Sequence, residues 1–353
     1  MNELLEFYKD KNVFITGHTG FKGTWLTRIL LLAGAKVTGY SLEPQTSPSL
    51  FETTKTENEI KSIIGDISDT VRLAEAMNVA KPEIVLHLAA QPIVRESYKD
   101  PVFTYMTNVM GTVSILEAVR KCETVKSFLN VTTDKVYLNK EWVWGYREDE
   151  ELCGYDPYSN SKSCSELVTY SYRNSFFNSN SSPAISTARS GNVIGGGDYA
   201  IDRIIPDCIR AVENKKQIIL RNPNSTRPYQ HVLECLRGYL TLAKMQFENN
   251  DIAGAYNFGP DDSSCVTTGM LADLFCSCWK ENSSWKSCED QNAPHEANFL
   301  KLDCSKSKKI LNWYPQWDIN TAMLKIVEWE KSVCAGIPAS VITDKQISEY
   351  FDI

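Results

Sequence analysis

The chain has 353 residues, of which 42% are hydrophobic and 23% charged, a composition typical of a folded protein rather than a disordered one. Its net charge of -7 argues against nucleic acid as the main partner, because binding to a phosphate backbone needs a surplus of Lys and Arg. The length exceeds what one hydrophobic core usually serves, so we expect two lobes with a binding cleft between them.

Alternating apolar runs and helical stretches fill the first half of the chain. Strands are predicted at residues 11–16 and 35–42, at a run ending at 63–66, and at 84–89, 127–132 and 184–188; helices are predicted at 24–32, 71–80, 98–122 and from 158 onward. Such alternation predicts a parallel sheet with crossover helices. We therefore predict a doubly wound α/β domain over residues 1–190.

The alternation loosens beyond residue 191, where Arg221-Asn222-Pro223-Asn224 carries turn signals. We expect residues 191–353 to form mainly a smaller, substrate-binding lobe, with a segment at about 228–260 returning to the first domain.

Membrane, metal and disulfide features are not expected. We find no segment with the ~20 apolar residues that a membrane span needs, and the start, MNELLEFYKD, carries several acids. Cys276 and Cys278 form a lone Cys-x-Cys, which without a second pair or a nearby His points only weakly to zinc. We expect a cytoplasmic protein with reduced thiols, no metal and no membrane partner.

Three glycines, Gly17, Gly20 and Gly23, lie between the first predicted strand and its helix in the run GHTGFKG. Glycine lets the backbone turn tightly and approach a pyrophosphate, which the N–H groups of the following helix stabilise. The position of the motif predicts a Rossmann dinucleotide site. His18 and Phe21 are assigned to the same site, and His18 and Lys22 are expected to add positive charge there.

The end of the second strand leaves the choice between NAD and NADP open. An acid commonly holds the ribose of NAD at this point, whereas here Ser41 occupies the expected contact position. Ligands bind at the carboxyl ends of strands in such sheets. We accordingly predict further cofactor contacts at Asp66, Ile67, Ala89 and Ala90.

A second motif is Tyr-x-x-x-Lys, formed by Tyr158 and Lys162. A spacing of four places both side chains on one helix face, where the ammonium is expected to lower the pKa of the phenol so that it can accept a proton. Thr133, Asp134 and Lys135 follow the fifth predicted strand, at the ligand-binding edge. We predict these five residues as the catalytic set, with Tyr158 and Lys162 also contacting the cofactor.

With these motifs, the stretches HLAAQPIVRESYKDP, EWVWGYRE, DPYSNSKSCSELV and ARSGNVIGGGDYA resemble the sugar-nucleotide 4,6-dehydratases of the extended short-chain dehydrogenase/reductase family, over almost the full chain. The greatest resemblance is to the group acting on CDP-glucose. It implies NAD as cofactor, CDP-glucose as substrate, a hydro-lyase reaction and a role in deoxysugar synthesis for bacterial surface polysaccharide.

The resemblance also implies an internal redox cycle. Tyr158 would deprotonate the sugar 4-hydroxyl as hydride leaves carbon 4, water would be eliminated across carbons 5 and 6, and the hydride would return to carbon 6. Asp134 is the expected acid for the departing 6-hydroxyl, and Thr133 is expected near the 4-hydroxyl. Lys135 stands where the dTDP-glucose enzymes carry Glu. It could be a base with a lowered pKa or a cation that stabilises an enolate, and the sequence leaves both roles open.

Four residues of the second half are assigned to the substrate. The resemblance implies that Asn192 contacts a phosphate, and Arg203, Arg227 and His231 are basic groups in an acidic chain. The planar guanidinium of Arg suits a diphosphate. His87, within an apolar strand, and His295 are left out of the site.

Three alternatives remain from the sequence: an inverting UDP-N-acetylhexosamine 4,6-dehydratase, a 4-epimerase, and a non-catalytic regulator that binds the cofactor. The long interval between Asp134 and Tyr158 disfavours the first, the Asp-Lys pair the second, and the intact Tyr158 and Lys162 the third. We further expect a homodimer, or a dimer of dimers, in which the helices near Tyr98 and Tyr158 pair with a second copy through the apolar faces of Val109, Val113, Leu116 and Val168.

Overall fold

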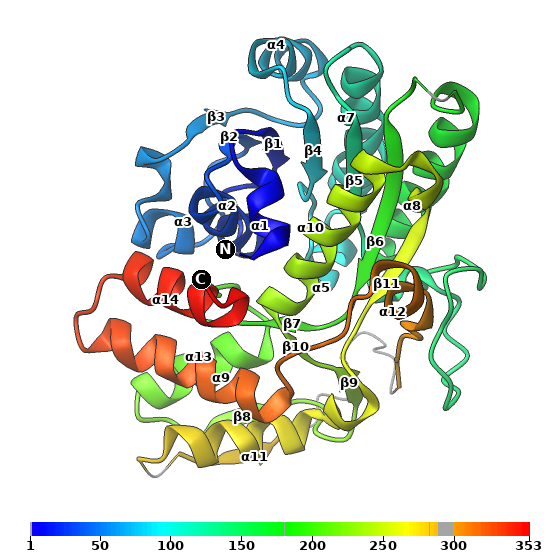
Figure 1. The fold of residues 1–353 in the computed structure, drawn as a ribbon. Helices are drawn as coiled ribbons and strands as arrows, with labels where there is room; N and C mark the ends of the chain where they lie inside the picture. Colours follow the sequence, from blue (N-terminus) through cyan, green and yellow to red (C-terminus); the bar gives the residue numbers. More distant parts are fainter. Residues whose placement is uncertain (1, 180, 282, 289–298) are drawn as a thin grey trace.

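A seven-stranded parallel sheet forms the centre of the computed structural model, which describes residues 2–179, 181–281, 283–288 and 299–353 (Figure 1). The strand order is β11-β6-β5-β4-β1-β2-β3, and every neighbouring pair is parallel. The strands are β1 (Asn12–Thr16), β2 (Lys36–Ser41), β3 (Lys61–Ile64), β4 (Ile84–His87), β5 (Ser127–Val131), β6 (Ala184–Ser190) and β11 (Ala255–Phe258). The predicted doubly wound fold class is confirmed.

Helices cover both faces of this sheet. Successive side chains of a strand point to opposite sides, so each strand can pack against helices on both faces. In β1, Val13 and Ile15 join one hydrophobic cluster and Phe14 joins the other. The first cluster contains residues of α2 (Phe21–Leu32) and α10 (Val232–Glu248), and the second contains residues of α4 (Thr70–Ala80) and α7 (Gly111–Arg120). On that second face α8 (Pro157–Phe176) packs beside α7.

The predicted helix over residues 98–122 is divided in the structure. It consists of α5 (Val94–Lys99), α6 (Pro101–Tyr105), a π-helical turn η2 (Met106–Met110) and α7. Asp100 ends α5 and caps α6, with Pro101 at the first helical position.

The run Pro101–Arg120 is long and apolar enough to cross a membrane by length and composition, which corrects our expectation that no segment is. Half of the run is buried inside the structure, as in the core helix of a folded domain, so it is a weak indication of a membrane span.

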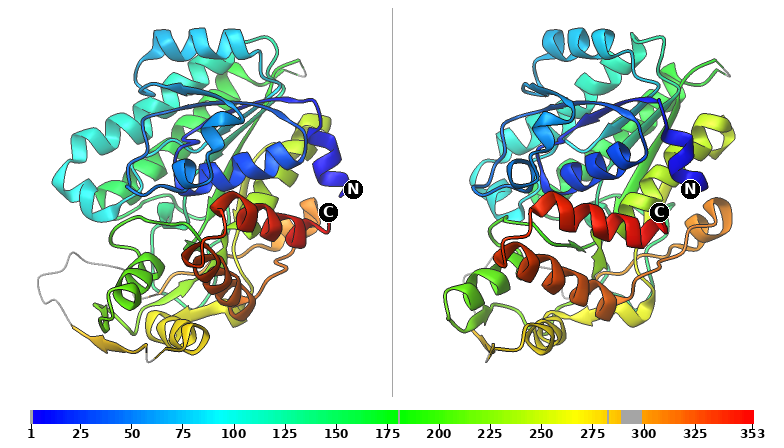
Figure 2. Two further views of the ribbon diagram at one scale, coloured as in Figure 1. Left: turned by 90° about the vertical axis from the view of Figure 1, so that its left-hand side faces the viewer. Right: turned by 60° about the vertical axis from the view of Figure 1, so that its left-hand side comes forward.

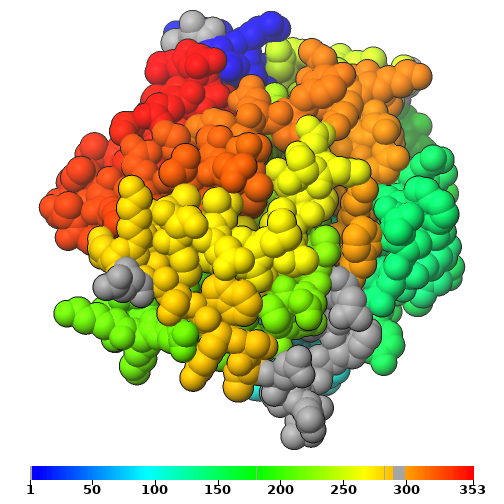
Figure 3. Space-filling model, turned by 90° about the horizontal axis from the view of Figure 1, so that it is seen from below, coloured from blue at the N-terminus to red at the C-terminus, as the bar shows by residue number. Residues whose placement is uncertain are grey.

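Residues from the second half of the chain build a lower lobe beneath the sheet (Figures 1 and 2). Its own hydrophobic cluster draws on α9 (Ile204–Glu213), β8 (Ile218–Leu220), α11 (Thr268–Trp279) and α13 (Ile319–Cys334). Together with α14 (Ala339–Phe351), helices α11 and α13 form much of the face seen from below (Figure 3). The remaining helices and turns are α1 (Glu3–Tyr8), α3 (Leu50–Thr53), α12 (Ser305–Leu311), η1 (Thr56–Asn58), η3 (Asp134–Val136), η4 (Asn250–Ile252) and η5 (Asp262–Ser264).

Three two-stranded sheets shape the lower lobe and its junction with the upper one. They pair β7 (Val193–Ile194) with β10 (Gln230–His231), β9 (Thr226–Pro228) with β12 (Cys265–Thr267), and β8 with β13 (Trp285–Ser287). Residues 228–260, which we expected to return to the first domain, supply α10 and β11. The domain boundary at residue 190 stays a prediction.

A cleft of about 1990 Å³ opens where the carboxyl ends of the parallel strands face the lower lobe. Ser41, Asp66, Ala89 and Thr133, which end or follow β2, β3, β4 and β5, all line it. Pockets for one ligand usually hold ~300–1,000 Å³, so this cleft has room for two ligands side by side.

Candidate active site

The glycine turn after β1 is shaped by two close approaches of backbone to backbone. Gly17 has a φ of +77°, and a Cβ there would lie 2.7 Å from the amide nitrogen of Ala89. A Cβ on Gly23 would lie 2.1 Å from the carbonyl oxygen of Gly17, so neither position has room for a larger residue. At Gly20, the N-cap of α2, the nearest atom would be 3.5 Å away. The turn brings the N-terminus of α2 to the cleft, where its N–H groups favour an anion.

His18 does not line the cleft, which corrects its assignment as a cofactor contact. Its ring is fully buried, its Nε2 lies 2.7 Å from Ser62 Oγ, and it packs edge-on against Phe51. Gly39 provides the space, because a Cβ there would come within 2.3 Å of the ring. Burial lowers the pKa of His18 to about 4, so the neutral ring adds no positive charge to the glycine turn.

The other predicted cofactor residues do line the cleft: Gly17, Gly20, Phe21, Gly23, Ser41, Asp66, Ile67, Ala89, Ala90, Tyr158 and Lys162. Ser41 Oγ lies 2.9 Å from the hydroxyl of Thr19. One carboxylate oxygen of Asp66 accepts hydrogen bonds from the N–H and hydroxyl groups of Ser68, both at 2.8 Å. The strand ends therefore present a continuous surface to a dinucleotide.

Tyr158 and Lys162 lie one turn apart at the start of α8. Asp156 caps the helix by accepting the N–H of Ser159 at 3.0 Å, and Pro157 occupies the first helical position. Lys162 Nζ donates to the carbonyl oxygen of Val131 at 3.1 Å. This contact ties α8 to the end of β5, which carries the Thr133-Asp134-Lys135 segment.

Burial disfavours the charged forms of both groups. Burial raises the pKa of Tyr158 to about 12, although a hydrogen bond with Thr133 and the charge of Arg203 act to lower it. Burial, followed by the nearby Lys22 ammonium, lowers the pKa of Lys162 to about 8. We expected Lys162 to lower the pKa of the phenol, but within the protein the desolvation of Tyr158 outweighs the neighbouring charges. Further positive charge is needed to stabilise the phenolate.

Thr133, Asp134 and Lys135 form one hydrogen-bonded group at the 3-10 turn η3. Asp134 Oδ1 accepts from the Thr133 hydroxyl and from Lys135 Nζ, both at 3.0 Å. Lys135 Nζ also donates to Asn192 Oδ1 at 3.3 Å. Thr133 and Lys135 line the cleft. The lysine thus donates hydrogen bonds to two acceptors.

Asp134 itself is fully buried beneath the cleft surface. Its Oδ2 has no hydrogen-bond partner within the described part of the chain. A Cβ on Gly191, which lines the cleft, would lie 2.8 Å from this oxygen. Gly191 therefore lies between the cleft and this unpaired carboxylate oxygen, and its missing side chain leaves the oxygen just beneath the cleft lining.

Lys22, which we expected to add positive charge at the glycine turn but did not predict as a contact residue, lines the cleft. Its Nζ donates to Ser190 Oγ at 3.1 Å and lies 5.9 Å from the centre of the Tyr239 ring. Burial lowers the pKa of Lys22, and the charges of Arg203 and Lys135 act in the same direction. Lys22 could have been recognised as a site residue from the sequence. A cation in the first turn of a helix opposes the helix dipole and is unfavourable there, so its presence needs another reason.

Three of the four predicted substrate residues line the cleft from the other side: Asn192, Arg203 and Arg227. Arg203 Nη1 lies 3.8 Å from Asp198 Oδ2, and Arg227 Nη1 donates to the carbonyl oxygen of Thr226 at 3.0 Å. The strand predicted at 184–188 continues to Ser190, so Arg189 lies within it rather than after it.

His231 does not line the cleft, and its predicted substrate contact is corrected. Its Nδ1 caps α10 by accepting the N–H of Leu233 at 3.3 Å, and its buried ring packs edge-on against Trp25 and Trp317. Burial lowers its pKa to about 3. Of the two histidines left out of the site, His87 is buried with Nδ1 2.6 Å from the Thr16 hydroxyl, and His295 lies outside the described residues.

The described residues contain no group of three or more His, Cys, Asp or Glu side chains placed to hold a metal ion. All eleven cysteines lie in described segments and are free thiols.

Comparison with known proteins relates the chain to nucleotide-sugar enzymes. The sequence pattern of the GDP-mannose 4,6-dehydratase family matches residues 14–326. A CDP-glucose 4,6-dehydratase of Salmonella typhimurium is 48% identical over 349 residues, covering 98% of this chain and 97% of the relative. A human dTDP-D-glucose 4,6-dehydratase is 30% identical over 79% of this chain and 77% of its own length.

Solved structures show the same fold at low sequence identity. The epimerase Mth375 of Methanothermobacter thermautotrophicus matches with a TM-score of 0.80 and 21% identity, over 95% of this chain and 96% of that one. A dTDP-glucose 4,6-dehydratase of Bacillus anthracis, solved in complex with NAD, matches with a TM-score of 0.74 and 19% identity, over 91% and 96% of the two chains.

Because burial lowers the pKa of Lys162, the buried ammonium should destabilise the fold by an amount that depends on pH. Near pH 7 the buried ammonium destabilises the fold by about 3 kcal/mol, the equivalent of a shift from 10.5 to about 8. The unfolded chain holds this proton up to a higher pH than the folded one, so the cost declines as pH rises through the folded pKa. We expect Lys162→Met to be more stable than wild type, with an advantage that shrinks by about 1 kcal/mol between pH ~7 and ~9. Urea unfolding at both pH values measures this, and a pH-independent difference would contradict it.

Proposed function

The chain belongs to the GDP-mannose 4,6-dehydratase family, and we propose that it converts CDP-D-glucose to CDP-4-keto-6-deoxy-D-glucose and water. The observation that carries the proposal is the meeting of Tyr158 and Lys162 with Thr133 and Lys135 at one cleft, with Asp134 bound to Lys135 just beneath its surface. The identity of the sugar nucleotide follows the relative that is 48% identical over 98% of the chain. The product is an early intermediate for deoxysugars of surface polysaccharide, and the free thiols suit a cytoplasmic enzyme.

The glycine turn and the strand ends fit NAD. Gly17 and Gly23 have no room for a side chain, and the N-terminus of α2 faces the same cleft, which suits a pyrophosphate. Ser41, Asp66, Ile67, Ala89 and Ala90 would hold the adenosine half, with Tyr158 and Lys162 at the nicotinamide half. When bound, NAD supplies the hydride acceptor and donor, and its oxidised ring carries the positive charge that a buried phenolate requires.

Tyr158 is the group that moves the proton of the sugar 4-hydroxyl. Its hydroxyl is hydrogen-bonded to Thr133, so both groups would reach the same substrate atom. Lys162 stays fixed against the Val131 carbonyl and stabilises the phenolate from behind. This arrangement holds the phenol within reach of the substrate throughout the cycle.

Elimination is assigned to Asp134 and Lys135. Asp134 Oδ2, unpaired beside Gly191, is the oxygen that would accept the carbon 5 proton and then give it to the departing 6-hydroxyl, which leaves as water and restores the carboxylate. Lys135, paired with Asp134 and Asn192, supplies a cation next to the enolate that forms as the carbon 5 proton leaves. We propose this electrostatic role for Lys135, and Asn192, Arg203 and Arg227 as the substrate-holding residues.

The activity is tested by incubating the pure protein and NAD with CDP-, dTDP-, UDP- and GDP-glucose and following the products by NMR. We expect a 4-keto-6-deoxy sugar from CDP-glucose in preference to the others. Tyr158→Phe should lower turnover by at least ~100-fold, because a positioned acid-base group contributes about that much. Conversion of another nucleotide sugar in preference to CDP-glucose would refute the substrate, and full activity of Tyr158→Phe would refute the role of the phenol.

Replacing Lys135 should separate the first step from elimination. We expect Lys135→Ala, mixed with CDP-glucose in a single turnover, to show the absorbance of reduced nicotinamide appear and persist, because oxidation at carbon 4 does not need the lost cation. Lys126→Ala is a matched control: this exposed lysine directly precedes β5, lies with Nζ 5.1 Å from the centre of the Phe247 ring and does not line the cleft. Normal product formation by Lys135→Ala would make Lys135 a structural residue, and failure to form reduced nicotinamide would move its role to the first step.

We also propose that the protein is a dimer formed through α6, η2 and α8. These elements pack against one another and expose large apolar side chains: Val102, Phe103, Met106, Met110, Leu167 and Tyr170. Of the four residues that we predicted for this surface, Leu116 is fully buried and Val168 packs against the core, whereas Val109 and Val113 are half-buried. Contiguous exposed apolar side chains of this kind commonly mark a protein interface.

Light scattering at micromolar concentration should give the mass of two chains. Met106→Glu and Leu167→Glu, which place a charge in the proposed interface, should shift the mass toward one chain. A wild-type mass of one chain would contradict the proposal.

A further inference from the structure

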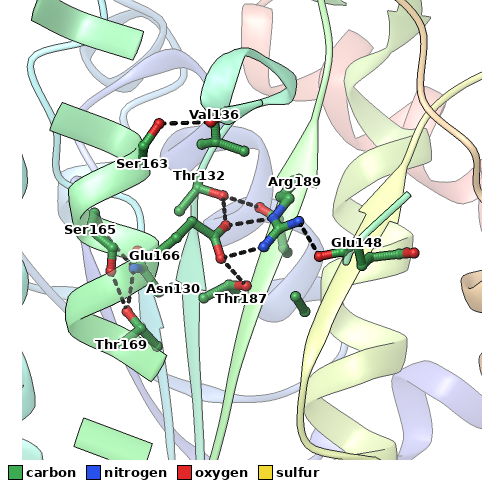
Figure 4. Close-up of polar contacts among 12 residues, drawn as sticks. Asn130, Thr132, Val136, Glu148, Ser163, Ser165, Glu166, Thr169, Thr187 and Arg189 are labelled. Carbon is green, nitrogen blue, oxygen red and sulfur yellow. Dashed lines mark hydrogen bonds and ion pairs between the residues drawn. The ribbon is translucent and has the colours of Figure 1, made fainter. Parts of the chain in front are cut away.

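A buried ion pair joins α8 to β6 behind the cleft (Figure 4). Arg189 donates from Nε to Glu166 Oε1 and from Nη2 to Oε2, each at 2.9 Å, and each side chain is 3% exposed. Two parallel bonds of this kind fix the mutual orientation of both side chains. Burial acts to raise the pKa of Glu166, but Arg189 and the neighbouring hydroxyls lower it overall, so the carboxylate remains charged.

The remaining polar atoms of the pair reach the neighbouring segments (Figure 4). Glu166 Oε1 also accepts the hydroxyl of Thr132, at the end of β5, and Oε2 accepts that of Thr187 at 2.7 Å. Arg189 Nη1 donates to the Tyr137 hydroxyl at 2.7 Å and to the carbonyl oxygen of Glu148 at 3.0 Å. One ion pair therefore contacts α8, the ends of β5 and β6, and both ends of the loop between residues 137 and 148.

Each of these segments carries catalytic or cleft-lining residues. Thr132 directly precedes Thr133, Asp134 and Lys135. On α8, Glu166 follows Lys162 by four positions and Tyr158 by eight, so the three side chains share one helix face. Arg189 stands three positions before Asn192, the partner of Lys135. The pair lies at the junction of the proton-transfer residues and the elimination residues.

The same pair anchors one wall of the cleft. Residues 138–141, which line the cleft, lie between Tyr137 and Glu148. The Tyr137 hydroxyl donates to Asn257 Oδ1 at 2.7 Å, and Glu148 Oε1 accepts the N–H of Asn257 at 2.8 Å. Asn257 belongs to β11, so the loop is held to the sheet through Arg189 and through this strand.

Stability alone is a weak reason for such a pair. Removing two charges from water costs about as much as their attraction returns, and a pair of apolar residues of the same volume is often equally stable or more so. Apolar residues, however, cannot fix the relative orientation of the elements that they join, because hydrophobic contacts are not directional. The five charge-assisted hydrogen bonds of Arg189 and Glu166 with one another, Thr132, Thr187 and Tyr137 set the relative position of elements that otherwise meet only through packing.

We propose that Glu166 and Arg189 are positioning residues of the active site: they hold Thr133, Asp134 and Lys135 in register with Tyr158 and Lys162 without contacting the substrate. The inference rests on the proposed dehydratase function. A displacement of about 1 Å in such a constellation lowers the rate by ~100-fold while substrate binding persists.

The test compares Glu166→Gln and Arg189→Lys with wild type at a temperature well below their unfolding transitions. Gln keeps the shape of Glu166 but offers Arg189 no charge, and Lys keeps the charge of Arg189 but not its bonds to Tyr137 and Glu148. We expect both to lower kcat for CDP-glucose by ~100-fold and to change KM by less than ~3-fold, because Arg203 and Arg227 hold the substrate from the other lobe. In a single turnover, both should slow the appearance of reduced nicotinamide.

Arg28→Lys is the matched control for the loss of a buried guanidinium. Arg28 is 4% exposed and forms ion pairs with Asp344 and Glu59, but it does not line the cleft. We expect it to lower the melting temperature by a similar amount while leaving kcat within ~3-fold of wild type, because stability lost far from the reacting atoms does not alter their alignment. A fall in kcat that simply follows the loss of stability in all three variants would overturn the proposal.

Thr132→Val gives a second route if Glu166→Gln or Arg189→Lys does not fold. It removes only the hydroxyl that donates to Glu166 and leaves the ion pair intact. We expect kcat to fall by at least ~10-fold with KM preserved, and wild-type kcat would overturn the inference. If wild type itself forms no product from CDP-glucose, the proposed function fails rather than the positioning role.

Discussion

The parallel hydrogen bonding of the central sheet is the constraint on which the site depends. Because all seven strands run in one direction, their carboxyl ends meet at one edge, and residues far apart in the sequence become neighbours there. Gly17 follows β1, Lys135 follows β5 and Asn192 follows β6, and all three line the same cleft. The register of β5 with β4 and β6 fixes where the Thr133-Asp134-Lys135 segment begins. The lower lobe then closes the other side with Arg203 and Arg227.

Burial at this edge sets the electrostatic conditions for chemistry. It raises the pKa of Tyr158 to about 12 and lowers the pKa of Lys162 to about 8, and it lowers the pKa of Lys22 as well. Without a ligand, the protein therefore favours the neutral form of the Tyr158 phenol. It also disfavours the charged forms of Lys162 and Lys22. The ionised phenol is stabilised only when further positive charge is present, as an oxidised nicotinamide provides. Proton removal is in this way coupled to the hydride acceptor rather than occurring without it.

Local patterns predicted what depends on local sequence. The glycine spacing, the Tyr158-to-Lys162 interval and the ends of the strands predicted many of the residues that line the cleft, because strand direction alone decides which residues reach the edge. The directions of side chains were missed where distant neighbours decide them. His18 turns into a space left by Gly39, and His231 packs between Trp25 and Trp317. Lys22 is half-buried, with Ser190 and Tyr239 beside it. Glu166 forms its ion pair because the fold brings Arg189 of β6 next to α8.

The central claim is that one hydride leaves carbon 4 of the sugar and returns to carbon 6 while the sugar stays in one cleft. The most direct measurement uses CDP-glucose carrying deuterium at carbon 4, with the product examined by NMR and mass spectrometry. The account predicts deuterium at carbon 6 of the 4-keto-6-deoxy product and no net accumulation of reduced cofactor. Recovery of the deuterium at carbon 4 of an intact hexose, in the cofactor, or in the solvent would contradict it.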